Sequence, residues 1–291
     1  MNEEILERYI QAGKGAAGIL QKGAALIRPG VSLAEVALKV EEMVLDAGLG
    51  VAFPVNISLN EAAAHDTPSL EDGRVFALGD MVKLDLGVHL DGYIADTAMT
   101  IDLGNQNQLV EASVAARDAA IARVKPGVTI GELGTAVAGE IGSRGFRPVA
   151  NLTGHGLDQY RLHMGPNVPN IPATGGAVLE EGMAIAIEPF ATTGTGFVSD
   201  QKRVEIYSQR IWRPVRMPAA RHILSEIEER QGLPFAKRHL KTQKPDLAIT
   251  RLVREGILHA YPVLADIPGS YVSQSEHTLI VTSDGCIVTT T

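Results

Sequence analysis

The chain has 291 residues, of which 45% are hydrophobic, and its formal net charge is −8. This length and composition suffice for a sizeable core in one large domain or in a domain with an insert, and the negative charge excludes nucleic-acid binding through bulk electrostatics. A single cysteine, Cys286, excludes an internal disulfide and suits a reducing cytosol.

The N-terminal segment predicts a helix and no targeting sequence. It is acidic and has no uninterrupted apolar run, so we expect neither a signal peptide nor a membrane span but a soluble cytoplasmic protein. Apolar residues at helical spacing extend over residues 3–27, and Pro29-Gly30 ends them. Ser32-Leu-Ala-Glu35 then matches a capping box, which predicts a second helix to about Ala47.

Two apolar, β-branched segments flank Asp91-Gly92, a strong signal for a β-hairpin over residues 82–101. With a two-residue turn, Asp96 lies opposite Gly87 and Asp85 is one pleat away on the same face. With a four-residue loop, Asp85 lies directly opposite Asp96. Two ionised carboxylates this close in a half-buried place repel each other. A divalent metal, a shared proton, or a solvated position for one aspartate would each resolve that repulsion.

The second half of the chain repeats the pattern of the first. Residues 109–124 are predicted to be helical, and Thr129-Ile-Gly-Glu132 caps a further helix towards Arg144. RPGVSLAE from Arg28 matches KPGVTIGE from Lys125 in residue class at every position. Two coincidental capping boxes are the alternative, but the shared prefix favours an internal duplication. Two similar α/β halves leave a cleft between their sheets, where a site built from distant segments would lie.

Three later segments supply side chains typical of metal ligands. His155 is flanked by glycines that let the backbone approach a neighbour closely. Glu188 ends an apolar strand, where an unpaired carboxylate is costly. Strand alternation places Glu276 on one face with Gln274 and turns His277 to the other.

The candidate ligands form an oxygen-rich set of four carboxylates and one imidazole. They are Asp85, Asp96, His155, Glu188 and Glu276. Such a set suits two divalent ions that share carboxylates. One ion would leave too much negative charge unbalanced.

The order of these motifs resembles that of the methionine aminopeptidases, over essentially the whole chain. An aspartate is followed eleven residues later by another, then by Gly-His-Gly, Ile-Glu-Pro and Ser-Glu-His-Thr. The resemblance implies an α+β, pita-bread (creatinase/aminopeptidase) fold with duplicated α/β halves. It implies that Asp85 chelates the first metal, that Asp96 and Glu276 bridge both, and that His155 and Glu188 complete the second. Glu188 would also shuttle protons, a role that Glu276 could share.

The implied activity is removal of the N-terminal initiator methionine from proteins and peptides by water that two divalent ions (cobalt, manganese, iron or zinc) activate. Three further residues gain roles only through the resemblance. His65 would hydrogen-bond near the scissile nitrogen, although alone it reads as a solvated loop histidine, and His163, at the end of the loop that holds His155, would steady charge on the carbonyl oxygen. Phe53 matches a residue that lines the methionine pocket, and ordinary core packing explains it equally well.

The segment between Glu188 and Glu276 decides the subclass. Helices are predicted at residues 218–231, 234–240 and 245–255, and a strand-like edge at residues 256–263. This segment resembles the small helical, winged-helix-like insert of type 2 methionine aminopeptidases, and the short N-terminus resembles archaeal members. We expect a catalytic domain of residues 1–207 and 268–291 and an insert subdomain of residues 208–267.

The insert is basic, with eleven Lys and Arg against four Asp and Glu over residues 210–254. A basic winged-helix face suits ribosomal RNA, but a solvated face that also walls the substrate cleft is favoured. We therefore expect a monomer that acts on peptides and nascent proteins with an N-terminal methionine, with at most a weak ribosome contact and no membrane contact.

Two other functions fit parts of the pattern. A proline-directed peptidase of the same fold, of the prolidase or aminopeptidase P type, usually carries an additional N-terminal domain, whereas the helix that precedes the first repeat here begins almost at Met1. A non-catalytic ribosome- or nucleic-acid-associated binding protein of the same fold would lose its metals, and retention of all five ligand types argues against it.

Overall fold

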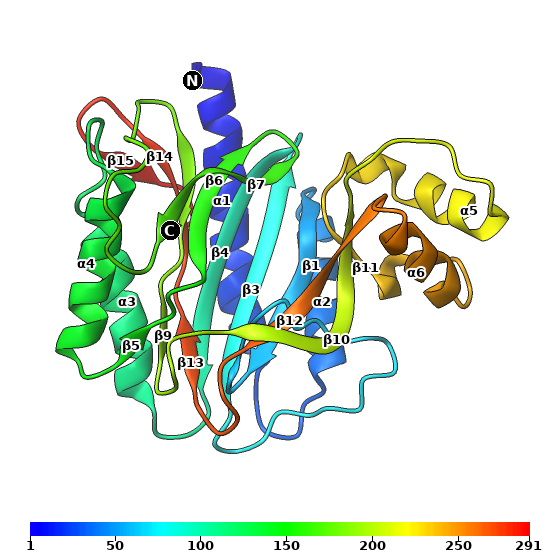
Figure 1. Cartoon of the computed structure of the whole chain (residues 1–291), viewed down its shortest axis with the longest axis horizontal. Helices are drawn as coiled ribbons and strands as arrows, with labels where there is room; N and C mark the ends of the chain where they lie inside the picture. Colours follow the sequence, from blue (N-terminus) through cyan, green and yellow to red (C-terminus); the bar gives the residue numbers. More distant parts are fainter.

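The computed structural model describes residues 1–291 as two helix-backed halves that meet at a central seam, with a smaller lobe on one side (Figure 1). In the first half, two helices cover an antiparallel sheet of order β1-β3-β4. Its elements are α1 (Glu3–Ala24), α2 (Leu33–Asp46), β1 (Gly50–Leu59), β3 (Met81–Leu90) and β4 (Tyr93–Asp102). Ile19 and Val36 of the helices pack with Leu84 and Leu86 of β3 in one core, as their apolar spacing predicts.

The β3–β4 hairpin has the two-residue turn. Gly87 pairs with Asp96, so the first of the two predicted registers is confirmed and the four-residue loop is not formed. Asp91 and Gly92 have φ values of 52° and 88°, and positive φ at both central residues is what a type I′ turn requires. The register leaves Asp85 and Asp96 on one face, one pleat apart.

The second half has the same plan, with two helices behind an antiparallel sheet of order β15-β14-β8-β6-β7. Its elements are α3 (Asn107–Ile121), α4 (Ile130–Ser143), β6 (Thr153–Asp158), β7 (Arg161–Pro169), β8 (Ala184–Ile187), β14 (His277–Val281) and β15 (Cys286–Val288). Leu109 and Val137 from the helices pack with Ile185 and Leu279 from the sheet. In both halves, the core on the helix side leaves the other face of the sheet free to carry polar side chains.

The predicted duplication is visible in the backbone before α2 and α4. Gly30 N donates to Phe76 O at 2.7 Å, and Gly127 N donates to Leu179 O at 2.9 Å. The equivalent residues Ser32 and Thr129 then each form an isolated β-bridge. Matched hydrogen bonds at matched sequence positions are the result expected of two halves with one ancestral plan.

Only one of the two predicted capping boxes forms. At α4, Thr129 N donates to Glu132 Oε2 at 2.8 Å and Glu132 N donates to Thr129 Oγ1 at 3.3 Å. At α2 the prediction is wrong, because the Ser32 side chain makes no capping hydrogen bond. Leu33 N donates to Arg74 O at 3.2 Å, just as Ile130 N at the start of α4 donates to Ala177 O at 3.1 Å, so a neighbouring loop satisfies the first N–H of both helices.

Two smaller sheets complete the fold, and one of them includes strands of the lobe. One, of order β11-β10-β12-β2, joins β2 (Ala62–Ala64), β10 (Ser199–Gln209), β11 (Phe235–Ala236) and β12 (Leu258–Ala265). The other, of order β13-β9-β5, joins β5 (Arg147–Pro148), β9 (Phe190–Thr192) and β13 (Val272–Gln274). Through β10 and β12, the lobe and the first half share a sheet.

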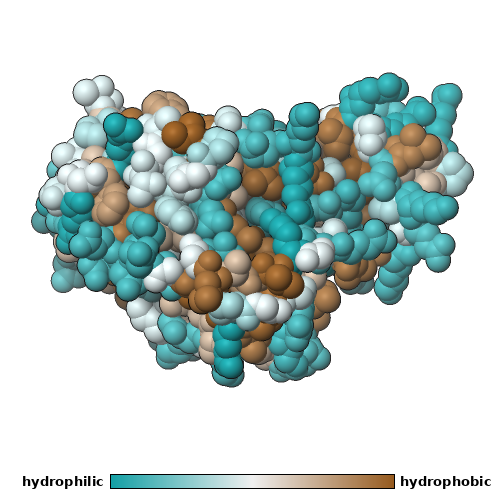
Figure 2. Space-filling model, turned by 90° about the horizontal axis from the view of Figure 1, so that it is seen from below, coloured by the Kyte–Doolittle hydropathy of each residue, from teal (hydrophilic) through white to brown (hydrophobic).

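The lobe has its own small core, which contains Ile223 of α5 (Pro218–Glu226), Leu252 of α6 (Asp246–Arg254) and Phe235. The helix predicted over residues 245–255 is confirmed as α6. That over 218–231 ends earlier and is followed by the 3₁₀ turn η1 (Glu228–Arg230). Hydrophilic side chains cover much of the projecting lobe (Figure 2).

The helix predicted over residues 234–240 is wrong. Phe235 and Ala236 pair with Tyr207 and Ile206 of β10, and only the 3₁₀ turn η2 (Lys237–His239) follows. Strand pairing with a distant segment therefore overrides local preference there. The predicted strand at residues 256–263 is β12, shifted by two residues. None of the helices is long and apolar enough to span a membrane.

Candidate metal centre

One cavity of about 300 Å³ is lined by all eight side chains singled out in the sequence. They are Phe53, His65, Asp85, Asp96, His155, His163, Glu188 and Glu276. They come from both halves and, in the case of His65, from the residue after β2, so only the folded chain brings them together. Strands hold most of them, and the loop predicted to hold His155 and His163 is wrong, because these residues lie on β6 and β7.

His155 is fixed in the sheet by its two glycine neighbours. A Cβ on Gly154 would lie 2.2 Å from Ala186 O, and one on Gly156 would lie 2.3 Å from Gly165 O. No side chain fits at either position, so the glycines allow β6 to approach its two neighbouring strands. The close approach that the sequence predicted is therefore present, and it buries His155 at 5% exposure.

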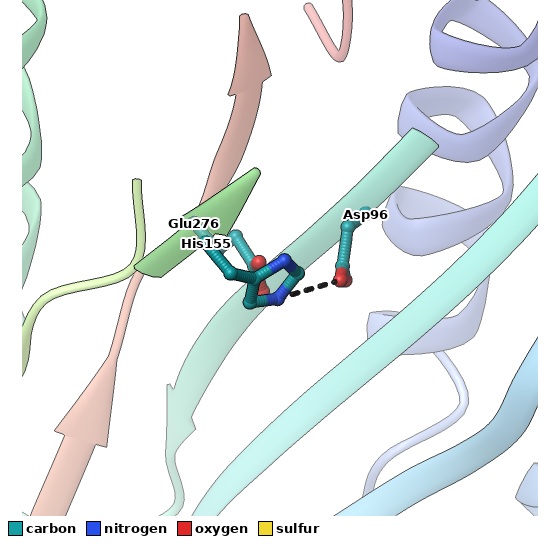
Figure 3. Close-up of side chains that lie close together, drawn as sticks. All are labelled: Asp96, His155 and Glu276. Atoms are coloured by element: carbon teal, nitrogen blue, oxygen red, sulfur yellow. Dashed lines mark ion pairs between the residues drawn. The ribbon is translucent and has the colours of Figure 1, made fainter. Parts of the chain in front are cut away.

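The imidazole of His155 lies among the carboxylates. Its Nε2 is 3.4 Å from Glu188 Oε1 and 3.6 Å from Asp96 Oδ2. Ligand atoms of Asp96, His155 and Glu276 all lie within 4.8 Å of one another, and Figure 3 shows the three side chains converging from β4, from β6 and from the segment between β13 and β14. Asp85 adjoins them one pleat along β3.

Threonine side chains of β4 form hydrogen bonds to the segment from β13 to β14. Thr97 Oγ1 donates to Glu276 O at 3.0 Å, and Thr100 Oγ1 donates to Gln274 O at 2.7 Å. Glu276 N donates to Ala98 O at 3.0 Å. These bonds set the backbone of Glu276 against that of β4, which carries Asp96.

Two amide side chains that the sequence did not single out as site residues also hold carboxylates. Asn56 Nδ2 donates to Asp85 Oδ2 at 3.3 Å, and Gln274 Nε2 donates to both Glu188 Oε2 at 3.4 Å and Glu276 Oε2 at 3.3 Å. Gln274 carried a signal, since it shares a strand face with Glu276. Asn56 carried none, because its position opposite Asp85 depends on the pairing of β1 with β3.

The electrostatics of the cavity oppose a set of free ionised carboxylates. Burial raises the pKa of Asp85 to about 7. Burial, and then the neighbouring carboxylates, raise the pKa values of Asp96, Glu188 and Glu276 well above their ordinary range. Burial lowers the pKa of His155 to about 4, so its imidazole is neutral at pH 7. The cluster therefore requires positive charge or protons to be stable.

The donor set fits divalent metal ions. Asp85 Oδ1, Asp96 Oδ1 and Glu276 Oε1 are buried and have no hydrogen-bond partner, a costly state unless each oxygen coordinates a cation. Oxygen ligands with one neutral imidazole suit manganese, iron, cobalt or zinc. Unpartnered oxygens on three different side chains also exceed what one shared proton can satisfy.

Two further histidines and a tyrosine line the cavity beside the ligand cluster. The ring centroids of His163 and His155 are 4.6 Å apart, edge to face. The ring of Tyr261 lies beside both histidines, with its centroid 5.4 Å from that of His65 and 6.1 Å from that of His163. Burial lowers the pKa of His65 to about 4, so it is neutral at pH 7.

Phe53 and its neighbours supply apolar lining. A Cβ on Gly87 would lie 2.1 Å from Phe53 Cε1, so the ring lies against β3, the strand that carries Asp85. Leu162 and Ile206 also line the cavity. An apolar wall beside a polar cluster is the arrangement expected of a pocket that binds a hydrophobic side chain next to a reacting group.

A duplicated α/β scaffold around a buried carboxylate and imidazole cluster defines a metal-dependent enzyme of the pita-bread fold. Residues 7–283 match the model of metallopeptidase family M24. The chain is 50% identical over its full length to a methionine aminopeptidase of Archaeoglobus fulgidus, covering 100% of both chains. It is 46% identical to that of Pyrococcus horikoshii, covering 98% of this chain and 99% of the relative.

A solved methionine aminopeptidase from Thermotoga maritima has the same fold, with a TM-score of 0.75 and 23% identity over 100% of this chain and 98% of the other. The chain therefore belongs to metallopeptidase family M24.

Proposed function

We propose that this protein is a methionine aminopeptidase, which removes the N-terminal initiator methionine from proteins and peptides. The observation that carries the proposal is the convergence of Asp85, Asp96, His155, Glu188 and Glu276 in one buried cavity, with unpartnered oxygens. The chain that carries this set matches proteins of that name from end to end.

These five residues would hold two divalent ions. Asp96 faces both the His155 ring and the Glu276 carboxylate, so it is suited to be shared between ions, and we assign Glu276 the same role. When bound, such ions lower the pKa of coordinated water towards neutrality and polarise a carbonyl oxygen.

The protein's own groups would then orient the substrate and move protons. We assign His65 to the leaving amine and His163 to the developing charge on the carbonyl oxygen, because both rings line the cavity beside the ligand cluster. We assign proton transfer to Glu188, and the contacts of its Oε1 with His155 and of its Oε2 with Gln274 support that assignment. Phe53 would contact the methionine side chain.

Several wider properties belong to the same proposal. We infer a cytoplasmic monomer with a catalytic domain of residues 1–207 and 268–291 and an insert of residues 208–267. The excess of basic residues in the insert supports at most a weak ribosome contact. Co-sedimentation with ribosomes at low and high salt tests that contact, and equal, negligible recovery at both would remove it.

Activity is tested with chelated protein to which manganese, iron, cobalt or zinc is returned. Methionine release from Met-Ala-Ser is expected, with no release from Xaa-Pro peptides. Turnover of Xaa-Pro peptides alone would favour a proline-directed peptidase. No turnover with any of the four metals would favour a binding protein of this fold.

A further inference from the structure

His65 occupies an uncommon backbone conformation at the edge of the cavity. Its φ is 63°, in the left-handed region, and it directly follows the short strand β2. Its ring is held only by an Nδ1 contact of 3.3 Å to Pro262 O and by the edge of Tyr261. A residue in this conformation stays in place only when the surrounding structure fixes it.

Three arginines fix the residues that follow. Arg74 binds the Asp66 carboxylate with two nitrogens, at 2.6 and 2.9 Å. Arg203 donates to Thr67 O at 3.3 Å. Arg238 donates to Thr67 Oγ1 at 2.6 Å and to Pro68 O at 2.8 Å. We call Arg74, Arg203 and Arg238 the arginine clamp.

The clamp comes from three parts of the chain and is itself anchored. Arg74 and Arg203, the latter on β10, also meet on Asp72 at 2.8 and 2.5 Å. Arg238 lies in η2 of the lobe, has a side chain only 2% exposed and pairs with Glu41 of α2. Fork-shaped guanidinium groups on buried carboxylates give fixed geometry as well as charge balance.

None of the clamp residues lines the cavity, so none is placed to touch substrate. They adjoin the cavity through the chain of Asp66, Thr67 and Pro68, and Arg238 adjoins it also through Glu41, which accepts a hydrogen bond from Val55 N of β1 at 3.1 Å. His65 is the cavity-lining residue directly joined to that segment, so displacement of the segment would move the His65 ring.

We propose that the arginine clamp is a positioning device for His65, through which the lobe and β10 hold that histidine in the cavity. This inference rests on the proposed function, in which His65 takes part in the reaction. Its consequence is that the lobe contributes to the rate of the reaction by fixing a group that lies outside it. A displacement of a reacting group by about 1 Å costs up to roughly 10²-fold in rate.

The variant Arg203→Met tests the proposal, because Arg74 remains paired with both Asp66 and Asp72 and so supports folding. We expect kcat for Met-Ala-Ser to fall by about tenfold, with KM and bound metal unchanged. Arg238→Lys, which keeps the charge and loses the fork, should show a smaller fall. The matched control is Arg251→Met, on the same lobe, whose ion-pair partner is Glu255 and not a clamp residue, and it should leave kcat unchanged.

The decisive measurement combines Arg203→Met with His65→Ala. If the clamp acts through His65, Arg203→Met should lower kcat by less than about twofold in a protein that already carries His65→Ala. An equal loss in both backgrounds would overturn the proposal, as would a change in KM alone.

Nuclear magnetic resonance of the metal-free protein gives a readout that needs no activity. The His65 ring signal, assigned by its absence in His65→Ala, should shift or broaden in Arg203→Met and stay unchanged in Arg251→Met. An unmoved signal in Arg203→Met would also overturn the proposal. Absence of methionine release from the wild-type protein would instead count against the proposed function, and the spectra would still test the clamp.

Discussion

Thr278 holds the backbone of Asp96 at both ends. Its Oγ1 accepts a hydrogen bond from Asp96 N at 2.8 Å and donates one to Asp96 O at 2.9 Å, across 182 residues of sequence. Thr278 lies on β14 of the second half and Asp96 on β4 of the first. A side chain of one half therefore fixes a candidate ligand of the other, and the geometry of the metal site depends on the seam.

Replacement of Thr278 by valine, which has the same shape, should loosen the site without unfolding the protein. Both bonds to Asp96 would be lost, and residues that orient metal ligands contribute about 10- to 100-fold to metal affinity. Metal titration of the chelated variant measures the loss. Thr278→Ser keeps the hydroxyl and should stay close to the wild type, so equal weakening in both variants would contradict this explanation.

Asp96→Asn should abolish turnover and metal occupancy together, because it removes the carboxylate that faces both His155 and Glu276. Elemental analysis and methionine release are measured on the same sample. Asp102→Asn, at the end of the same strand, is the control, since Asp102 caps only the backbone of Gly104 and Gln106. Substantial activity in Asp96→Asn would mean that the ligands are assigned wrongly.

His65→Ala should slow methionine release by about 10² to 10⁴-fold, the usual range for loss of a positioned acid-base or oxyanion group. Metal content should not change, because His65 is not among the five ligands. The control is His222→Ala, whose side chain is 66% exposed on the lobe. Loss of metal from His65→Ala would assign that residue a different role.

Divalent metal should stabilise the folded protein. Four buried carboxylates repel one another in its absence, and a ligand that binds only the folded state adds about 2.7 kcal/mol to the free energy of unfolding at 100 times its Kd. Denaturant unfolding with and without manganese measures this gain. Asp96→Asn should lose most of it, and an equal gain in that variant would place the bound metal elsewhere.

Glu41 should give acid-sensitive stability to the contact between α2 and the lobe. Burial alone would raise its pKa, but a hydrogen bond from His239 and the charge of Arg238 lower it to about 2. Burial lowers the pKa of His239, so Arg238 supplies the positive charge. Because the folded pKa lies below the ordinary value of 4.5, the stabilisation is present at neutral pH and is lost as the pH falls from about 4.5 to 2.

The pH dependence of Glu41 is measured as a difference between proteins. The free energy of unfolding of the wild type should exceed that of Glu41→Gln at pH 7, with a pH-dependent part on the order of 3 kcal/mol. That part should shrink in acid. A difference that stays constant down to pH 3 would show that the carboxylate charge contributes nothing.

The sequence by itself determined the parts of the protein that depend on local chemistry. Asp91-Gly92 specified the hairpin, because few residue pairs tolerate positive φ at both turn positions. That turn then placed Asp85 and Asp96 on one face, since side chains alternate along a strand. The glycines beside His155 and the carboxylate of Glu188 were also informative. Glycine and glutamate are unusual in an apolar strand, so each marked a position with a special local role.

Only the tertiary structure decided what lies between distant segments. Phe235 and Ala236 became a strand because β10 was available to pair with them, and nothing in the local pattern separates Ser32, which makes no capping bond, from Thr129, which makes one. Asn56, Tyr261 and the arginine clamp had no sequence signal, since each matters through a partner far along the chain. Local pattern fixes which groups a strand or turn presents, whereas packing of the two halves and the lobe fixes which of those groups meet.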